Sequence, residues 1–253
     1  MKSKTIISII GGGSIYTPEL VSLLIRNTDV LGNIELRLMD IDESRLQTVG
    51  VFCERMIQKN NSPIDISYYS EYKNAVFEAD YVLIQFRVGG GEARIKDEKL
   101  GRKYKIPFVE TVSVCGFATF LRTYYQMEQL VENILLYAPD AWVMNFANPA
   151  GMLTEALYVL GLQKIVGVCN ASIKLLDFLS NKFKTTDIQL NWRGLNHFTI
   201  TDGIFINGKN MLQNLLENLK DYEDSSIPFP ADLLQSIEML PNQHYQYYIL
   251  QRA

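Results

Sequence analysis

Cysteine and histidine are scarce in this sequence, which has three cysteines and two histidines among 253 residues. Cys53, Cys115 and Cys169 are odd in number and widely spaced, which argues against a disulfide framework and favours a reducing, cytoplasmic setting. No apolar stretch reaches about 18 residues, so no membrane-spanning helix is expected. Between the charged start and the first glycine lie only residues 5–10, too few for the apolar core of a secretory signal.

Clusters of positive charge are missing as well. Lys and Arg total 24 against 28 Asp and Glu, which gives a net charge of −4. A nucleic-acid-binding protein needs a basic patch to meet the phosphate backbone, so that class is not expected. What is present is an ordinary globular composition, 47% hydrophobic and 21% charged. It is sufficient for a sizeable core in one large domain or two smaller ones.

Strand and helix patterns alternate along the first two thirds of the chain. Short β-rich runs predict strands at 5–10, 34–42, 64–70, 80–86, 141–147 and 164–169. Apolar residues at helical spacing predict helices at 17–31, 43–60, 71–79, 119–138 and 150–161. This alternation predicts an α/β fold, with a Rossmann-like, doubly wound, mostly parallel sheet over residues 1–187.

The pattern changes after about Asp187. Residues 188–208 are strand-rich and contain an Asn-Gly turn at 207–208. A helix is expected at 210–221, followed by a proline-containing stretch and a further helix. Residues 188–253 are therefore expected to begin a second domain of the α+β class.

A glycine-rich loop joins the first predicted strand to the first helix in the stretch "TIISIIGGGSIYTPEL". In dinucleotide-binding folds the first glycine makes the tight turn and the second lets the backbone approach the pyrophosphate, roles that Gly11 and Gly13 can take. The third position of the G-x-G-x-x-G pattern is Tyr16, so the match is imperfect. Asp40, at the end of the second strand, can accept hydrogen bonds from ribose hydroxyls. The alternative is a tight strand–helix turn that binds nothing.

Polar residues follow two later strands, at the edge where doubly wound sheets bind ligands. In "QFRVGGGEARIKDE", Arg87 and Arg94 can bind a phosphate or carboxylate through the guanidinium fork, or can be ordinary surface residues. In "NFANPAG", Asn145 and Asn148 bracket a turn, and asparagine before proline is also common in turns without a ligand.

Two further candidates are Cys169 in "GVCN" and His197 in "GLNHF". A thiolate and an imidazole together could bind a divalent transition metal and leave positions for substrate. A lone cysteine is more often a small buried hydrophobe, however, and a lone histidine is more often structural. The two residues are 28 positions apart, so their spacing does not decide between these interpretations.

Taken in order, "GGGSIYTPEL", "RVGGGEARIKDE", "NFANPAG", "GVCN" and "GLNHF" resemble glycoside hydrolase family 4 over nearly the whole chain. The resemblance implies a hydrolase of 6-phospho-glycosides that depends on NAD and a divalent metal of the manganese type, and the first two motifs are similar to the 6-phospho-β-glucosidase branch. In that family NAD takes a hydride from sugar C3 and a base removes the acidified C2 proton. The glycosidic bond then breaks by elimination, water adds, and the ketone is reduced back.

The resemblance also implies roles for individual residues. Gly11, Gly13, Ser14 and Asp40 would bind NAD, Cys169 and His197 would hold the metal, and Arg94, Glu110, Asn148 and Asn170 would face the sugar or its 6-phosphate. Residues 1–187 would be the NAD-binding domain, and residues 188–253 part of a region for substrate, metal binding and oligomerisation.

The sequence departs from the family pattern in three places. After "ET" the family usually has a Gly-Pro-Gly-Gly loop, whereas "ETVSVCGF" keeps Gly116 alone, so residues 113–115 are expected to stiffen and fill this loop. The tyrosine that acts as C2 base falls on His244 in "LPNQHYQYY", with Tyr245 beside it; either could be the base, or the base could be lost. The chain also ends at Ala253, whereas family members continue.

This length suggests a natural short form, a truncated reading frame or a deliberately shortened chain. It predicts exposed apolar surface after residue 187, covered by homo-oligomerisation.

Three functions remain open at this point. The first is an active glycosidase acting on a phosphorylated disaccharide or glycoside. The second is a catalytically impaired family member that binds NAD and sugar phosphate. The third is an NAD-dependent dehydrogenase of the 2-hydroxy-acid type, which would need a catalytic histidine with a partnering acid after "NFANPAG", where no such motif is found.

Overall fold

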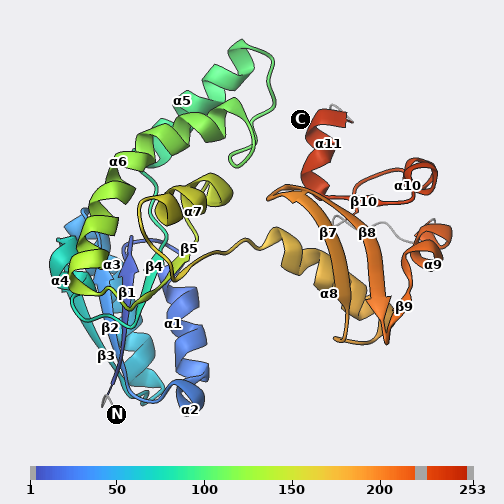
Figure 1. Cartoon of the computed structure of the whole chain (residues 1–253). Coiled ribbons are helices and arrows are strands. Elements are labelled where there is room, and N and C mark those ends of the chain that lie inside the picture. The colour runs from blue at the N-terminus through green and yellow to red at the C-terminus, as the bar shows by residue number, and fades with distance from the viewer. Residues whose placement is uncertain (1–3, 220–226, 250–253) are drawn as a thin grey trace. The chain divides into compact units, whose positions relative to one another are not determined.

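The computed structural model describes residues 4–219 and 227–249, and the chain forms two compact units (Figure 1). The first unit comprises Met1–Arg94 and Thr119–Val168, and the second comprises Ile95–Ala118 and Cys169–Ala253. None of the three cysteines, all of which lie in the described ranges, forms a disulfide, as their spacing predicts. Within the described ranges, no helix combines the length and apolar character needed to cross a bilayer.

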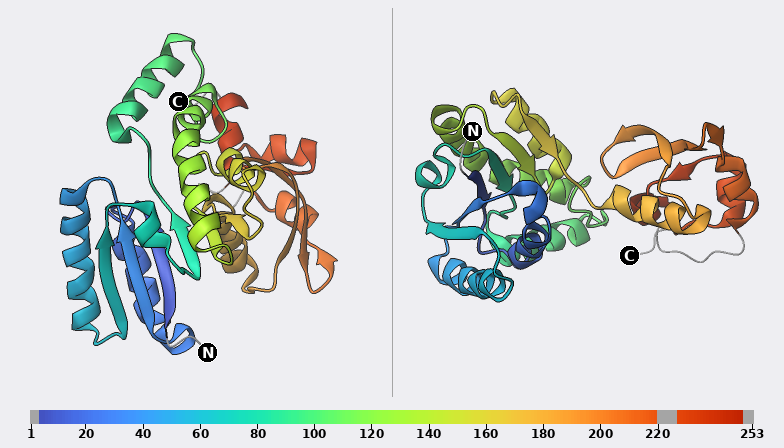
Figure 2. Two further views of the ribbon diagram at one scale, coloured as in Figure 1. Left: turned by 60° about the vertical axis from the view of Figure 1, so that its left-hand side comes forward. Right: turned by 90° about the horizontal axis from the view of Figure 1, so that it is seen from below.

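The first unit is built on a six-stranded parallel sheet (Figure 2). Its strands are β1 (Thr5–Ile10), β2 (Ile34–Met39), β3 (Ile64–Tyr69), β4 (Tyr81–Ile84), β5 (Trp142–Asn145) and β6 (Ile165–Gly167). They lie in the order β3-β2-β1-β4-β5-β6, and every pair is parallel. This is the doubly wound order, which reverses direction between β1 and β4. The predicted fold class is confirmed, and all six predicted strands are present.

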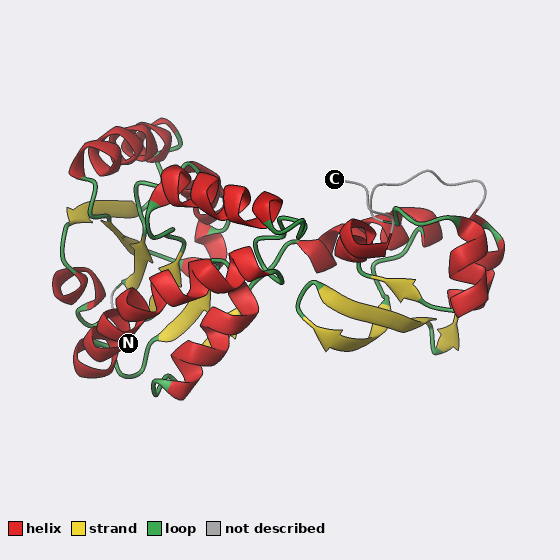
Figure 3. Cartoon of the chain, turned by 90° about the horizontal axis from the view of Figure 1, so that it is seen from above, coloured by secondary structure: helices red, strands yellow, loops and turns green. Residues whose placement is uncertain are grey.

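Helices pack against both faces of this sheet (Figure 3). They are α1 (Thr17–Arg26), α2 (Thr28–Leu31), α3 (Glu43–Lys59), α4 (Tyr72–Val76), α6 (Val114–Tyr137) and α7 (Ala150–Val159). A further helix, α5 (Gly90–Lys103), contributes no residue to the cores on either face, and most of it belongs to the second unit. Successive side chains of β1 point to opposite faces, so Ile9 packs in a core with α1 and α3, and Ile10 in a core with α4, α6 and α7. Helix α5 begins within the glycines of 89–91, where the sequence indicated a loop with flexible glycines beside Arg87 and Arg94.

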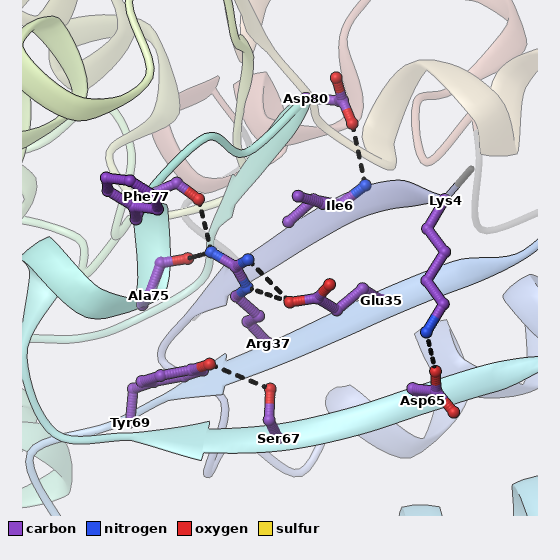
Figure 4. Close-up of polar contacts among 10 residues, drawn as sticks. All are labelled: Lys4, Ile6, Glu35, Arg37, Asp65, Ser67, Tyr69, Ala75, Phe77 and Asp80. Atoms are coloured by element: carbon purple, nitrogen blue, oxygen red, sulfur yellow. Dashed lines mark hydrogen bonds and ion pairs between the residues drawn. The ribbon is translucent and has the colours of Figure 1, made fainter. Parts of the chain in front are cut away.

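A buried arginine fastens α4 to the sheet (Figure 4). Arg37 of β2 is 8% exposed, and its guanidinium pairs with Glu35 at 2.7 Å. It also donates to the carbonyls of Ala75 and Phe77, at 3.5 and 2.5 Å. These carbonyls belong to the C-terminal end of α4, which has no further helical turn to satisfy them. The guanidinium therefore caps the C-terminal end of α4, and the same hydrogen bonds, with the Glu35 ion pair, offset the cost of burying its charge.

The second unit is a small antiparallel sheet with helices on it. Its elements are α8 (Ala171–Phe183), β7 (Gln189–Leu195), β8 (Phe198–Ile206), β9 (Lys209–Asn210), α9 (Leu212–Glu217), α10 (Ala231–Ile237), β10 (Leu240–Pro241), the 3₁₀ turn η2 (Gln243–Tyr245) and α11 (Gln246–Ile249). The sheet order is β10-β8-β7, and β9 pairs with β8. The Asn207-Gly208 turn is confirmed: both residues have positive φ, as the two-residue hairpin turn requires. The helix predicted at 210–221 is observed as α9 over Leu212–Glu217, and residues 220 and 221 of that prediction lie outside the described residues.

Helix α8 belongs to the second unit. Its apolar residues, including Phe178 and Leu179, pack with Ile204 of β8 and Leu215 of α9. The units therefore divide at Cys169, earlier than the position near 187 at which the sequence composition changes. The composition change coincides with the start of β7 rather than with the point where the chain leaves the first core. Residues 95–118 also belong to the second unit, although they lie between two segments of the first unit in the sequence. No local sequence pattern predicts this assignment.

Candidate functional site

The glycine loop between β1 and α1 is shaped by contacts that exclude side chains. Gly11 has φ +92°, and a Cβ there would lie 2.8 Å from the backbone nitrogen of Phe86. A Cβ on Gly12 would meet Leu38 at 2.8 Å, and one on Gly13 would meet Asp40 at 2.9 Å. Tyr16, at the third motif position, is 65% exposed. Gly11 is thus required by its positive φ and by the backbone beside it, whereas a side chain at position 13 would displace the Asp40 carboxylate. The third motif position is in solvent and needs no glycine.

Asp40 is tied directly to this loop. One carboxylate oxygen accepts from the N–H of Gly13 at 2.9 Å, and the other accepts from the N–H of Asp42 at 3.0 Å. Each carboxylate oxygen keeps a second lone pair, so Asp40 can still accept from a hydroxyl. Ser14 accepts from the N–H of Tyr16 through its hydroxyl at 3.3 Å. The loop and the acid thus meet at the carboxyl edge of the sheet, the edge at which doubly wound folds bind their ligands.

The other predicted residues of the first unit differ in exposure. Asn145 is fully buried, and its amide bonds to Ala147, Ala150 and Thr154. It therefore organises the turn, which was the structural alternative. Asn148 is exposed at the start of α7, and Arg94 and Arg87 are exposed on and before α5. The three residues therefore lie at the surface, whereas Asn145 does not.

In the second unit, Cys169 and His197 are brought together. The Cys169 sulfur lies 3.0 Å from Nε2 of His197, although 28 residues separate them in sequence. His197 occupies the two-residue turn between β7 and β8, with φ +64°, a conformation that costs energy for a residue other than glycine. Its other ring nitrogen, Nδ1, is 2.7 Å from the buried hydroxyl of Thr111. The imidazole is therefore fixed at both nitrogens.

The pair fits a divalent metal ion. Bond lengths of about 2.3 Å to sulfur and 2.1 Å to nitrogen put two ligands about 3.1 Å apart at a right angle, close to the separation of Cys169 and His197. Burial, with a contribution from His244, lowers the pKa of His197 to about 4, so the imidazole is neutral and can offer a lone pair. No group of three or more His, Cys, Asp or Glu residues arranged around a metal site is found in the described ranges. The site would leave coordination positions for oxygen atoms of a ligand.

His244 stacks on this pair. Its ring centroid is 3.8 Å from that of His197, and Nδ1 is 2.8 Å from the side-chain oxygen of Asn242. Because that oxygen can only accept, Nδ1 carries the proton and Nε2 keeps a lone pair. Burial and the nearby Lys174 lower the pKa of His244. His244 is thus a neutral imidazole with a basic nitrogen beside the thiol–imidazole pair.

Tyr245 is placed differently. Its hydroxyl donates to the carbonyl of Phe198 at 3.3 Å, and its ring packs on Phe198 with the centroids 4.8 Å apart. Tyr245 therefore fixes η2 against β8. Of the two candidates for the base, His244 is the one in contact with His197.

Two predicted substrate residues also lie in the second unit. Asn170 is exposed at the N-terminus of α8, directly after Cys169, and Glu110 directly precedes Thr111. The departure at 113–115 is the beginning of helix α6 rather than a loop. The Ser113 hydroxyl donates to the carbonyl of Val109 at 2.7 Å and accepts from the N–H of Cys115 at 3.1 Å, so the expected stiffening has a structural basis.

Three residues of this site were not anticipated from the sequence. Thr111, Asn242 and Lys174 act on the histidines through a hydrogen bond or through charge. Thr111 is 86 residues from His197, and the pairing depends on the inserted segment 95–118 joining the second unit. Asn242 stands two residues before His244, so the Asn-x-His spacing was a local signal that could have indicated it.

The fold and the site define the chain as a dinucleotide-type α/β protein. Its first unit is doubly wound and has a glycine-rich loop, and its second unit contains the thiol–imidazole pair. The family model for "Family 4 glycosyl hydrolase" matches residues 6–185. The chain is 36% identical to a probable 6-phospho-beta-glucosidase of Bacillus subtilis, over 94% of this chain and 57% of that protein. The chain therefore belongs to family 4 of the glycosyl hydrolases, not to the dehydrogenases that share its sheet topology.

Solved structures agree with this assignment. The 6-phospho-beta glucosidase of Thermotoga maritima, determined with manganese, NAD+ and glucose-6-phosphate, superimposes with a TM-score of 0.89 at 31% identity and covers 98% of this chain and 60% of that one. A 6-phospho-alpha-glucosidase from gut microorganisms, in complex with NAD and Mn2+, has a TM-score of 0.88 at 26% identity, with 97% and 60% covered. This chain spans about three fifths of the length of the relatives it matches.

Proposed function

We propose that this protein is an NAD- and divalent-metal-dependent 6-phospho-glycosidase, with manganese as the metal. The observation that carries the proposal is the contact of Cys169, His197 and His244 in one cluster. Of the functions considered, a glycosidase of this family requires both such a metal pair with a base beside it and a dinucleotide loop. A dehydrogenase of the 2-hydroxy-acid type would need a catalytic histidine with a partnering acid and would not need the Cys169 thiol.

Most of the assigned residues would bind the cofactor, the metal or the substrate, and one would transfer a proton. We assign Gly11, Gly13, Ser14 and Asp40 to NAD, Cys169 and His197 to the metal, and Arg94, Glu110, Asn148 and Asn170 to the sugar and its 6-phosphate. When bound, NAD supplies a hydride acceptor and the metal supplies Lewis acidity toward the sugar oxygens.

We assign the base to His244. Its Nε2 lone pair takes the proton from C2 once C3 has been oxidised, and the electron pair left on C2 expels the glycosidic oxygen. Asn242 holds the ring by accepting from Nδ1–H, so the basic nitrogen is presented in a fixed direction. Lys174 and burial keep the ring neutral, which is the form that can accept a proton.

The substrate class is a phosphorylated β-glucoside. The support is that three β-type relatives are 33–36% identical over 94–100% of this chain, whereas three α-type relatives are 29–31% identical over 75–96% of it. A sugar 6-phosphate carries charge that does not cross a bilayer unaided, and NAD is an intracellular cofactor, so we infer that the protein works in the cytoplasm.

The test is release of p-nitrophenol from its 6-phospho-β-glucoside, measured with NAD and Mn2+ together and with each omitted. We expect turnover with both present and none when either is left out. Cys169→Ala and His244→Asn are expected to abolish turnover, whereas Tyr245→Phe, which loses a hydroxyl bonded to the backbone, is expected to keep it. Turnover without NAD would contradict the oxidation step, and loss in Tyr245→Phe with retention in His244→Asn would reverse the assignment of the base.

A second candidate is a family member that binds NAD and sugar phosphate without turnover. The observation that favours it is that His244, and not a tyrosine, is the residue that contacts His197 at the position of the base. The same experiment separates the two, because calorimetric binding of NAD with no p-nitrophenol release would select this candidate.

We also infer a homo-oligomer. Strand β7 ends the second sheet, and Leu195 and Trp192 on it are 79% and 38% exposed. Light scattering on the eluting protein is the measurement, and a monomer at tens of micromolar would contradict the inference.

A further inference from the structure

The glycine loop is supported from its buried side by two polar residues. Thr17 opens helix α1 and is fully buried. Its hydroxyl donates to the carbonyl of Gly12 at 2.9 Å and accepts from the side-chain amide of Gln85 at 2.7 Å. The same amide nitrogen of Gln85 lies 3.3 Å from the carbonyl of Gly11. A single short chain of hydrogen bonds thus holds two consecutive carbonyls of the loop.

Gln85 reaches the loop because of the sheet topology. It follows β4 directly, and its own N–H donates to the carbonyl of Ile10, the last residue of β1, at 2.9 Å. The two strands are parallel neighbours at the point where the sheet order reverses (Figure 1). The amide is therefore delivered from a different strand than the one that leads into the loop.

The N–H groups of the glycine loop are fixed by hydrogen bonds as well. The N–H groups of Gly11 and Gly12 both donate to the carbonyl of Met39, at 2.8 and 2.7 Å. The N–H of Gly13 donates to Asp40. Every peptide plane from Gly11 to Gly13 is consequently held by at least one hydrogen bond to a neighbouring strand or its side chains.

We propose that Thr17 and Gln85 are positioning residues for the NAD site. They hold the carbonyls of Gly11 and Gly12 on the buried side, so that these oxygens do not face the pyrophosphate of the cofactor. A carbonyl oxygen turned toward a phosphate would repel it, and a loop free to rotate would lose entropy on binding. The proposal rests on the proposed function, because it takes NAD as the ligand of the loop.

The substitution that tests it is Thr17→Val, which keeps the shape of the side chain and removes the hydroxyl. We expect it to weaken NAD binding about tenfold, as positioning partners of a binding site do. Thr17→Ser retains the hydroxyl and is expected to bind NAD within about threefold of the unmodified protein. Gln85→Met is expected to resemble Thr17→Val, and the double variant to be no more than slightly weaker than either, because both residues act through one network.

The matched control is Thr48→Val. The Thr48 hydroxyl also donates to a carbonyl at 2.9 Å, but it lies exposed on α3. The readout is the Kd for NAD from calorimetry on the full chain, with urea unfolding and Mn2+ binding by electron paramagnetic resonance measured on the same samples. Mn2+ binding is expected to be unchanged in all variants.

The outcomes are distinguishable. If the unmodified chain binds no NAD, the proposed function fails, and this inference fails with it. If it binds NAD and Thr17→Val binds equally well, this inference alone is overturned. A weaker Kd in Thr17→Val that Thr17→Ser does not restore would also overturn it, since the effect would then come from packing and not from the hydroxyl.

Discussion

At the scale of single residues, His197 links the backbone strain of a tight turn to the chemistry of the second unit. Its side chain is buried, it contacts Cys169, Thr111 and His244, and its φ of +64° is unfavourable for any residue with a Cβ. The fold holds it there because β7 and β8 pair up to the residues on either side. A glycine would adopt this φ more readily, but it would not supply the imidazole that contacts Cys169 and Thr111.

The lowered pKa of His197 makes the stability of the second unit depend on pH. In the unfolded chain a histidine has a pKa of about 6.5, whereas in the folded state it is about 4. Between these two values the histidine is protonated in the unfolded chain but neutral in the native protein. The contribution of His197 to the free energy of unfolding is therefore complete above pH 6.5 and decreases as the pH is lowered toward 4. We expect a loss of about 1–2 kcal/mol between pH 7 and pH 5.

The measurement is urea unfolding of the metal-free protein at the two pH values. His197→Asn is the control, because asparagine tolerates a positive φ and does not titrate. The variant is expected to show a smaller loss between pH 7 and pH 5. A loss of equal size in the variant would assign the pH dependence to other groups, and stability that rises toward pH 5 would contradict the direction of the shift.

At the scale of an element, α4 has five residues, too few to be stable by itself, and it is held to the sheet by Arg37. Arg37→Met removes the cation that caps the carbonyls of Ala75 and Phe77 and leaves Glu35 without its partner. We expect a loss of about 2–3 kcal/mol in the free energy of unfolding.

The matched control lies in the same sheet. Lys4 forms an ion pair with Asp65 (Figure 4), and these side chains are 42% and 69% exposed. Lys4→Met is expected to leave urea unfolding unchanged, because exposed pairs contribute little. Equal effects of Lys4→Met and Arg37→Met would mean that burial does not distinguish the two pairs, and the capping role would have to be abandoned.

Elements also show where local sequence signals suffice. The Pro18 start of α1 and the Asp42 cap of α3, whose carboxylate accepts from the N–H of Arg45 at 3.0 Å, are readable from composition because their partners lie within one turn. Helix α5 was not foreseen, because its glycines suggest a loop and its apolar residues are few.

At the scale of the whole molecule, the two units have separate cores, and each contains one tryptophan. Trp142 lies in β5 of the first unit and Trp192 in β7 of the second. Trp192→Phe and Trp142→Phe therefore leave a single fluorescent reporter in either unit. Two cores with their own reporters make it possible to observe whether the units unfold separately.

Leu215→Ala removes a fully buried side chain from the second core, and Leu153→Ala does the same in the first. Each is expected to cost about 2–5 kcal/mol in its own unit. The urea midpoint reported by Trp192 is expected to shift in Leu215→Ala more than that reported by Trp142, and the reverse is expected in Leu153→Ala. Identical shifts at both tryptophans would contradict separate cores and mean that the chain unfolds as one cooperative unit.

Local sequence patterns were enough to predict the class of the first unit, its six strands, and the glycine loop with Asp40. These features are coded locally, because strand and helix periods, caps and glycines act over a few residues and parallel strands meet at a common edge. The resemblance indicated Cys169 and His197 as a pair, which their spacing could not do.

The tertiary structure alone decided the rest. It brought Thr111 to His197 across 86 residues, placed His244 rather than Tyr245 beside it, and joined Thr17 and Gln85 under the glycine loop. Contacts between distant segments depend on how separate elements pack, and no local pattern specifies that packing. For the same reason the boundary between the units follows the packing of α8 against β8 and α9, not the change of composition near Asp187.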